Sequence, residues 1–155
     1  MFSIKFKQGK SPEDAKRKYA RKKKQVQNGL STAFKKVSIY LDQWVQQNFQ
    51  TQGKKSDPKG WQPFKYPEWG RHITGKGWDA SAKLLMDTGR LRASVIPFHN
   101  AMDAGVGSDL DYSKIHDEGI GVPQRRILPR QSKNPEVRKK AYRILDNEIN
   151  KALLK

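Results

Sequence analysis

The sequence predicts an α+β fold in which a long amphipathic helix and a C-terminal helix pack on a small antiparallel sheet. Three observations favour this class. Apolar residues recur three and four positions apart in residues 31–49 and again from residue 135 onward, a spacing that places them on one helix face. Between these helices, residues 95–98 and 102–106 resemble two short strands around a turn. A chain of 155 residues is the usual size of one domain, so we expect one core.

The first 30 residues are predicted to form a basic strand and arm, and residues 31–155 a single α+β domain. Phe2, Ile4 and Phe6 alternate with polar residues, which is the period-two pattern of a half-buried strand. Glycine and proline follow closely and end this pattern. We therefore expect a short strand at the start of the chain.

A strongly basic block follows this strand. Ser11 and Pro12 resemble a helix N-cap followed by a proline in the first helical position. The block contains seven cationic residues: Lys16, Arg17, Lys18, Arg21, Lys22, Lys23 and Lys24. Two interpretations stay open, namely a solvated basic helix or tail and an arm that contacts a polyanion such as DNA.

Residues 31–49 are predicted to form the main core helix. Its apolar stripe consists of Phe34, Val37, Leu41, Trp44, Val45 and Phe49. Glycines and an Asp-Pro pair indicate a loop over residues 51–60, which Trp61 and Phe64 should pin onto the end of the helix. Residues 65–78 show no period, so we expect an irregular connection able to order against a neighbouring subunit; its basic and aromatic residues could alternatively stack on single-stranded bases.

Residues 84–129 combine apolar anchors, turn glycines and fixed polar residues most densely. A short helix is expected over residues 79–86, and Asp87 or Thr88 could cap the next helix. Pro97 places the first strand at a sheet edge or bulge, and the turn is expected at residues 99–101.

Four apolar residues should hold this dense region to the core, and three glycines should set its turns. The anchors are Leu91, Val95, Val106 and Ile115, and the glycines are Gly89, Gly107 and Gly119. Tyr112, Ile115 and His116 have helical spacing, and Val122 begins an extended arm that carries three arginines.

The C-terminal helix is expected to open at Pro135 and to pack on the sheet or on the main core helix. Its apolar face consists of Val137, Ala141, Ile144, Leu145, Ile149, Ala152 and Leu153.

Composition favours a protein that binds other macromolecules. The formal net charge of +17 favours polyanions or acidic protein surfaces as partners. Because the chain has no cysteine, disulfides, thiolate metal sites and thiol catalysis are excluded. No apolar run has the roughly 20 residues of a membrane span, and no secretory signal is evident, so we expect an intracellular compartment or an assembly made there.

Candidate catalytic and metal-binding patterns are sparse, so we expect neither an enzyme nor a bound cofactor. The three histidines are scattered and lack the spacing of a zinc site. Asp117 and Glu118 are adjacent and would point in different directions, which makes a poor acid/base pair. His116 is expected to be a structural hydrogen-bonding residue. A hydrolase would need a pocket that gathers His116, Asp117 and an activated serine, and no spacing in the sequence suggests one.

The order of several short motifs resembles the phage virion morphogenesis family, the tail-completion proteins of Mu-like and other tailed phages and prophages. The resemblance extends from about residue 30 to the C-terminus. Its motifs are Phe49 through Phe64 with Asp57-Pro58-Lys59-Gly60 and Trp61-Gln62-Pro63, the block Leu85 to Val95, Gly107, Tyr112 with Ile115-His116, Gly119, and Val122-Pro123 with Arg125 and Leu128. The chain departs from the family pattern at Arg126-Ile127, in the tryptophan-rich segment 66–78 and in its basic N-terminal block.

The resemblance implies a structural protein of the tail or neck that finishes the tail or joins it to the head. It implies other tail or neck proteins as partners, a homo-oligomeric ring in the virion, and a place in the host cytoplasm during assembly. Arg90, His116, Arg125 and Arg126 are the positions we assign to an assembly interface. In a ring around DNA, lumenal cations would contact phosphates without reading sequence. The alternative is an autonomous basic nucleic-acid-binding protein.

Overall fold

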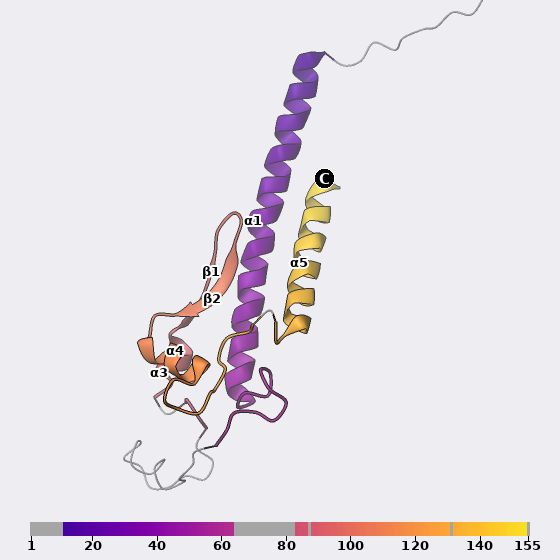
Figure 1. Ribbon diagram of the computed structural model, residues 1–155. Helices are drawn as coiled ribbons and strands as arrows, with labels where there is room; N and C mark the ends of the chain where they lie inside the picture. The colour runs from indigo at the N-terminus through magenta and orange to yellow at the C-terminus, as the bar shows by residue number, and fades with distance from the viewer. Residues whose placement is uncertain (1–10, 64–82, 87, 131, 155) are drawn as a thin grey trace, which may run out of the picture.

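The structure, a computed structural model, describes residues 11–63, 83–86, 88–130 and 132–154. A long helix forms the axis of the molecule, and a hairpin and a second long helix pack along it (Figure 1). The predicted α+β class is confirmed. The described elements are α1 (Pro12–Gln50), α3 (Arg90–Ala93), β1 (Val95–His99), β2 (Ala104–Ser108), α4 (Asp111–Glu118) and α5 (Pro135–Leu153).

Helix α1 is continuous over 39 residues and includes both the basic block and the predicted core helix. It begins as predicted, because Ser11 is the N-cap, its Oγ accepts a hydrogen bond from the Asp14 N–H at 3.3 Å, and Pro12 occupies the first helical position. The helix does not break at residue 30. The division into an N-terminal arm and a separate domain stays a prediction.

The C-terminal end of α1 turns into the predicted loop. Gly53 adopts a left-handed conformation with φ of 87°, and its N–H donates to the Asn48 carbonyl at 2.8 Å. The ring of Trp61 lies so close to Gly53 that a β-carbon there would overlap it. Trp61 also packs edge-to-face on Phe49, with ring centroids 5.4 Å apart. The prediction that Trp61 pins the loop to the helix end is therefore confirmed.

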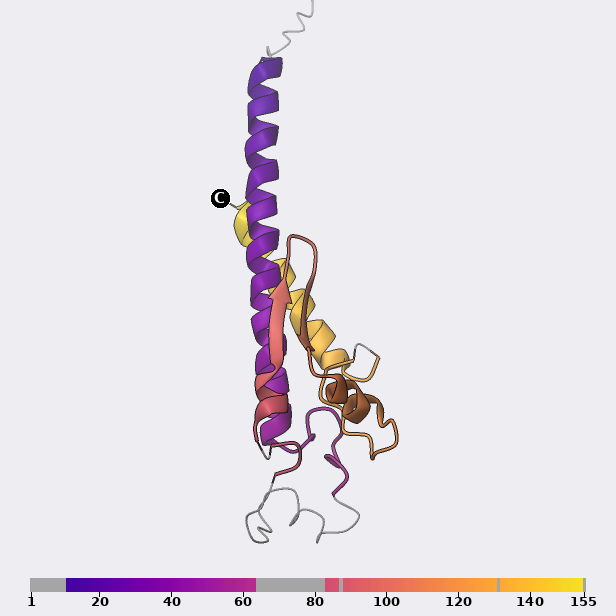
Figure 2. The ribbon, with the colours of Figure 1, turned by 90° about the vertical axis from the view of Figure 1, so that its left-hand side faces the viewer.

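Helix α5 packs antiparallel on α1, and the prediction that the two amphipathic helices meet is confirmed. The two helices pack tightly at Gly29, where a β-carbon would lie 2.6 Å from the Ala152 Cβ. Residues 11–24 lie beyond this contact and are all exposed. The N-terminal part of α1 therefore projects past the hairpin and past α5 (Figures 1 and 2).

Strands β1 and β2 form the predicted antiparallel pair, with Pro97 opposite Val106. The turn lies later than predicted: His99 belongs to β1, and residues 100–103 make the connection. It is closed by a hydrogen bond from the Asn100 N–H to the Asp103 carbonyl at 2.8 Å. Met102, expected at the start of the second strand, consequently lies in the turn and is 86% exposed.

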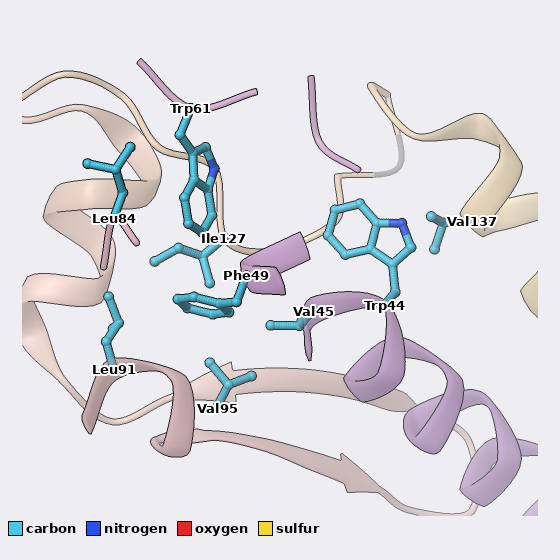
Figure 3. Packing of buried hydrophobic residues seen from close by; sticks show 9 residues of the cluster. All are labelled: Trp44, Val45, Phe49, Trp61, Leu84, Leu91, Val95, Ile127 and Val137. Atoms are coloured by element: carbon cyan, nitrogen blue, oxygen red, sulfur yellow. The ribbon is translucent and has the colours of Figure 1, made fainter. Parts of the chain in front are cut away.

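The core gathers around the C-terminal half of α1. Figure 3 shows these side chains around Phe49, which is completely buried. They come from α1, the following loop, the turn at residues 83–86, α3, β1, the extended arm and α5: Trp44, Val45, Phe49, Trp61, Leu84, Leu91, Val95, Ile127 and Val137. Leu91 and Val95 are thus core anchors as predicted, and Val106 packs against this cluster.

Three local predictions were wrong. Ile115 is 37% exposed, because the side chain that α4 buries is Asp117, two positions further on. Gly107 sets no turn, since it lies in β2 opposite Ile96. The N-cap of α3 is Gly89, in a left-handed conformation and without a side-chain cap, instead of Asp87 or Thr88. Gly119, with φ of 77°, does end α4 as predicted.

Several predictions concern residues outside the described part of the chain. They are the strand at residues 2–6, the irregular connection at 65–78, the anchor Phe64 and most of the helix at 79–86. Within that last segment, residues 83–86 form a turn instead of a helix.

Candidate functional site

The extended arm over residues 122–130 is held across the end of α1 by buried polar side chains. Asp117 of α4 is 8% exposed, and its Oδ1 accepts hydrogen bonds from the N–H groups of Ile127 at 2.7 Å and Leu128 at 3.0 Å. Its Oδ2 accepts from Arg130 Nη2 at 3.0 Å. One carboxylate thus accepts hydrogen bonds from two main-chain N–H groups and a guanidinium. A buried extended segment that is not paired in a sheet needs such partners for its main-chain groups.

The second anchor is Asn48 of α1, which is completely buried. Its Nδ2 donates to the carbonyls of Arg126 at 2.8 Å and Ile127 at 3.3 Å, and its Oδ1 accepts from the Ser56 N–H at 3.1 Å. The Arg126 carbonyl also accepts from Ser56 Oγ at 3.1 Å and from Trp61 Nε1 at 2.9 Å. This carbonyl is therefore the point where α1, the following loop and the arm are joined.

Arg125 and His116 lie together beside this junction. Arg125 is 4% exposed; its N–H donates to the His116 carbonyl at 2.8 Å, and its Nε donates to the Gln62 carbonyl at 3.3 Å. Burial lowers the pKa of Arg125. Burial, and secondly the charge of Arg125, lower the pKa of His116, which favours the neutral imidazole. Within the described residues, His116 Nδ1 is buried without a hydrogen-bond partner, so the structural hydrogen bond at this position comes from its carbonyl.

The four predicted interface residues do not form one surface. Arg125 is buried, and His116 and Arg126 are partly buried beside it. Arg90 is exposed on α3, and no hydrogen bond among the described residues links its side chain to the arm. The region that looked most functional in the sequence is therefore mainly a device that fixes the arm.

The arm and the side chains that hold it lie within the part of the chain that matches a known protein family. Residues 11–145 match the phage virion morphogenesis family. The chain belongs to this family. Comparisons with curated proteins and with solved structures give no match. Membership in the morphogenesis family means that the protein acts in the assembly of a phage virion and associates with other virion proteins.

Sequence reasoning missed two buried amides of this morphogenesis protein. Asn134 is 4% exposed; its Oδ1 accepts from the Arg130 N–H at 3.1 Å, and its Nδ2 donates to the Lys55 carbonyl at 3.3 Å. Asn48 was the other. A signal for Asn48 existed, because it lies three residues after Val45 on the apolar stripe of α1, where a polar residue must find buried partners.

The two buried side chains that hold the arm, Asp117 and Asn48, use their polar atoms in hydrogen bonds within the protein. The Asp117 carboxylate already accepts three hydrogen bonds, so it is poorly placed to remove a proton from a substrate. Across residues 11–63, 83–86, 88–130 and 132–154, no group of three or more histidine or acidic side chains is placed to hold a metal ion. None of the helices in this part of the chain is long and apolar enough to cross a membrane.

The basic block occupies the projecting part of α1. All seven of its cationic residues are exposed: Lys16, Arg17, Lys18, Arg21, Lys22, Lys23 and Lys24. At about 100° per residue they are distributed around the whole helix instead of along one face. Like charges three and four residues apart destabilise an isolated helix, so a polyanion bound here would relieve repulsion within α1.

An apolar groove of about 360 Å³ lies between α1, β2 and α5. Its floor and walls are formed mainly by apolar side chains and the main chain of β2. The lining residues are Phe34, Val37, Leu41, Ala104, Gly105, Val106, Leu128, Pro129, Val137, Ala141, Tyr142 and Leu145, together with the polar residues Asp103, Arg130, Asn134 and Arg138. The predictions from the sequence did not include this surface, because it exists only after the hairpin and α5 pack on α1.

Proposed function

We propose that this protein is a structural component that completes the tail or joins it to the head during assembly of a tailed, Mu-like phage. The observation that carries the proposal is the family match over residues 11–145, which spans α1, the arm and most of α5. The geometry supports a structural role, because the side chains of Asp117 and Asn48 form hydrogen bonds to the main chain of the arm. We further propose that the protein is not an enzyme and works as a homo-oligomeric ring in the tail or neck.

Exposed apolar side chains support association with other copies or virion proteins. Ile96 is 60% exposed and Phe98 49% exposed on the outer face of the hairpin, and Met102 is 86% exposed at its tip. Apolar residues of this size gathered on one small hairpin are typical of a contact surface. The hairpin is therefore the surface that we propose to be covered in the virion.

Inactivation of the gene in the encoding phage tests the proposal. Lysates should contain filled heads and separate or abnormal tails, seen by electron microscopy, and expression of the wild-type protein in trans should restore joined particles. Ile96→Asp and Phe98→Asp together should fail to restore them although the protein folds, whereas Lys59→Asp and Lys133→Asp, at exposed sites elsewhere, should succeed. Complete infectious virions in the absence of the protein would refute the assignment.

The projecting cationic helix supports a second candidate, an autonomous nucleic-acid-binding protein. The purified protein would then bind DNA without sequence preference, with log affinity falling linearly against log salt concentration. Neutralising Lys22, Lys23 and Lys24 to glutamine should reduce the slope by up to about 3, since each phosphate contact contributes about 0.9.

Glutamines at three exposed lysines elsewhere provide the matched control for this second candidate: Lys35, Lys59 and Lys133. This control should bind as the wild type does. An assembly defect in a protein without intrinsic DNA affinity would instead favour the structural role alone.

A further inference from the structure

The groove between α1, β2 and α5 has an open strand edge as one wall. Antiparallel ladders alternate between pairs that exchange hydrogen bonds and pairs whose main-chain groups point away from each other. The Asn100 N–H to Asp103 carbonyl bond marks an exchanging pair, and Pro97, which lacks an N–H, lies three ladder positions further along, opposite Val106. The main-chain groups of Ala104 and Val106 therefore point outward, away from β1.

This outward edge combines apolar side chains with main-chain groups that can form hydrogen bonds. The side chains of Ala104 and Val106 share the face of Val95, which is 4% exposed, and they line the groove. No hydrogen bond from elsewhere in the described residues reaches the main chain of either residue. A strand added here would form main-chain bonds to β2 and would direct alternate side chains onto α1 and α5, as in other cases of strand addition.

We propose that residues 2–6 of a second copy occupy this groove as a third strand beside β2. Phe2, Ile4 and Phe6 supply alternate apolar side chains for the groove, and Ser3 and Lys5 would face solvent. The groove requires an extended segment with alternating apolar side chains, and residues 2–6 of this chain have that pattern. A foreign segment with the same pattern is the competing occupant.

The reach of the chain requires the second copy. Among the α1 residues that line the groove, Phe34 lies nearest the start of the helix. From Pro12 to Phe34, α1 rises about 33 Å, and the level of Val37 lies about 5 Å further, at 1.5 Å per residue. Fully extended back along the helix, the chain from residue 11 to Ile4 spans at most about 25 Å. Ile4 therefore cannot lie beside Val106 of its own chain.

Such a contact is head-to-tail. Residues 2–6 precede α1 in the sequence, while the acceptor groove is lined by Phe34, Val37 and Leu41 of α1, so the donated and accepting surfaces differ. Heterologous contacts of this kind generate rings where the rotation closes and filaments where it does not. This contact would be one way in which copies associate during assembly, so it rests on the proposed function in that one respect.

Engineered cysteines test the contact in the full-length protein, because the natural chain has none. Chains carrying Ile4→Cys are mixed with size-tagged chains carrying Ala141→Cys, a residue of the groove wall, and treated with a short bismaleimide cross-linker. We expect a cross-linked band at the sum of the two masses. Ser3→Cys in place of Ile4→Cys is the matched control, and its band should be much weaker because its side chain faces solvent.

A second measurement avoids dependence on cysteine chemistry. Light scattering should show that Ile4→Asp reduces the mass of the assembly to that of the monomer, whereas Ser3→Asp, which adds the same charge, does not. Four results would each overturn the proposal. In cross-linking, they are equal yields from Ile4→Cys and Ser3→Cys, or a cross-link within one chain of an Ile4→Cys/Ala141→Cys double variant. In light scattering, they are equal behaviour of the two aspartate variants, or a wild type that stays monomeric. Intact tail completion by Ile4→Asp would discard this contact and leave the proposed function standing.

Discussion

The isosteric change Asn48→Asp isolates the junction between α1 and the arm. It replaces the amide that donates to the Arg126 and Ile127 carbonyls at 2.8 and 3.3 Å with an oxygen that faces them. Two lost hydrogen bonds cost about 1 kcal/mol each. The side chain is completely buried, and an uncompensated buried charge raises the total cost to about 3–5 kcal/mol near pH 7. This is a large part of the roughly 5–15 kcal/mol that stabilises an ordinary domain.

The sign of the pH dependence provides an independent check on this variant. Burial opposite two carbonyls raises the pKa of the introduced carboxyl above its unfolded value of about 3.9. A group with a raised folded pKa contributes stability below its unfolded pKa and loses it as the pH rises through the folded pKa. The deficit of Asn48→Asp should therefore be small near pH 4 and grow towards pH 8.

Urea unfolding followed by circular dichroism measures the free energy of unfolding of each variant across this range. Gln47→Glu introduces a charge at the adjacent exposed position and should change that free energy by less than about 0.5 kcal/mol. Asn48→Ala, which adds no charge, should cost about 1–3 kcal/mol and serves where the aspartate variant does not fold. A deficit below about 1 kcal/mol for Asn48→Asp, or one that does not change with pH, would refute the hydrogen-bonding scheme.

Three further changes examine other contacts. The NMR titration of His116 should give a pKa below about 6.5, since burial and the neighbouring arginine favour the neutral ring. The stability that the neutral His116 ring contributes is then lost as the pH falls through the folded pKa. His116→Gln should remove this part of the pH dependence of unfolding. Gly29→Val should lower the free energy of unfolding by about 1–3 kcal/mol by forcing α1 from α5, whereas Asn28→Val, at an exposed site, should change it much less. Trp61→Phe, which removes the Nε1 donor to the Arg126 carbonyl, should cost about 1–2 kcal/mol, and an unchanged denaturation midpoint would contradict this contact.

The helices and the hairpin could be predicted because their signals are local. The apolar stripe of α1, the Ser11-Pro12 start and the period of α5 depend on residues three and four apart, and the structure retains them. The hairpin turn lies later in the chain than predicted because Met102, although apolar, does not pack into the core. Its position depends on the register with Pro97, which only tertiary structure fixes.

The site could be predicted only in part because its logic is long-range. Arg125 and His116 were assigned to an assembly interface, which stays a prediction, and the side chains that hold the arm reach it from α1 and α4. Asn48 is separated from its acceptor Arg126 by 78 positions. Asp117 was considered only as an acid/base candidate, because hydrogen bonds from main-chain N–H groups leave no mark in the sequence. Ile115 was wrongly assigned to the core for the same reason, since the bonds of Asp117 set the buried face of α4.

The assembly role itself is tested most directly by complementation in vitro. Purified wild-type protein is added to a lysate of phage in which the gene has been inactivated, and infectious particles are counted with electron microscopy in parallel. We expect that the wild-type protein alone restores joined, infectious virions, and that a folded Ile96→Asp/Phe98→Asp variant does not. Heads and tails that join equally well with or without the added protein would contradict it.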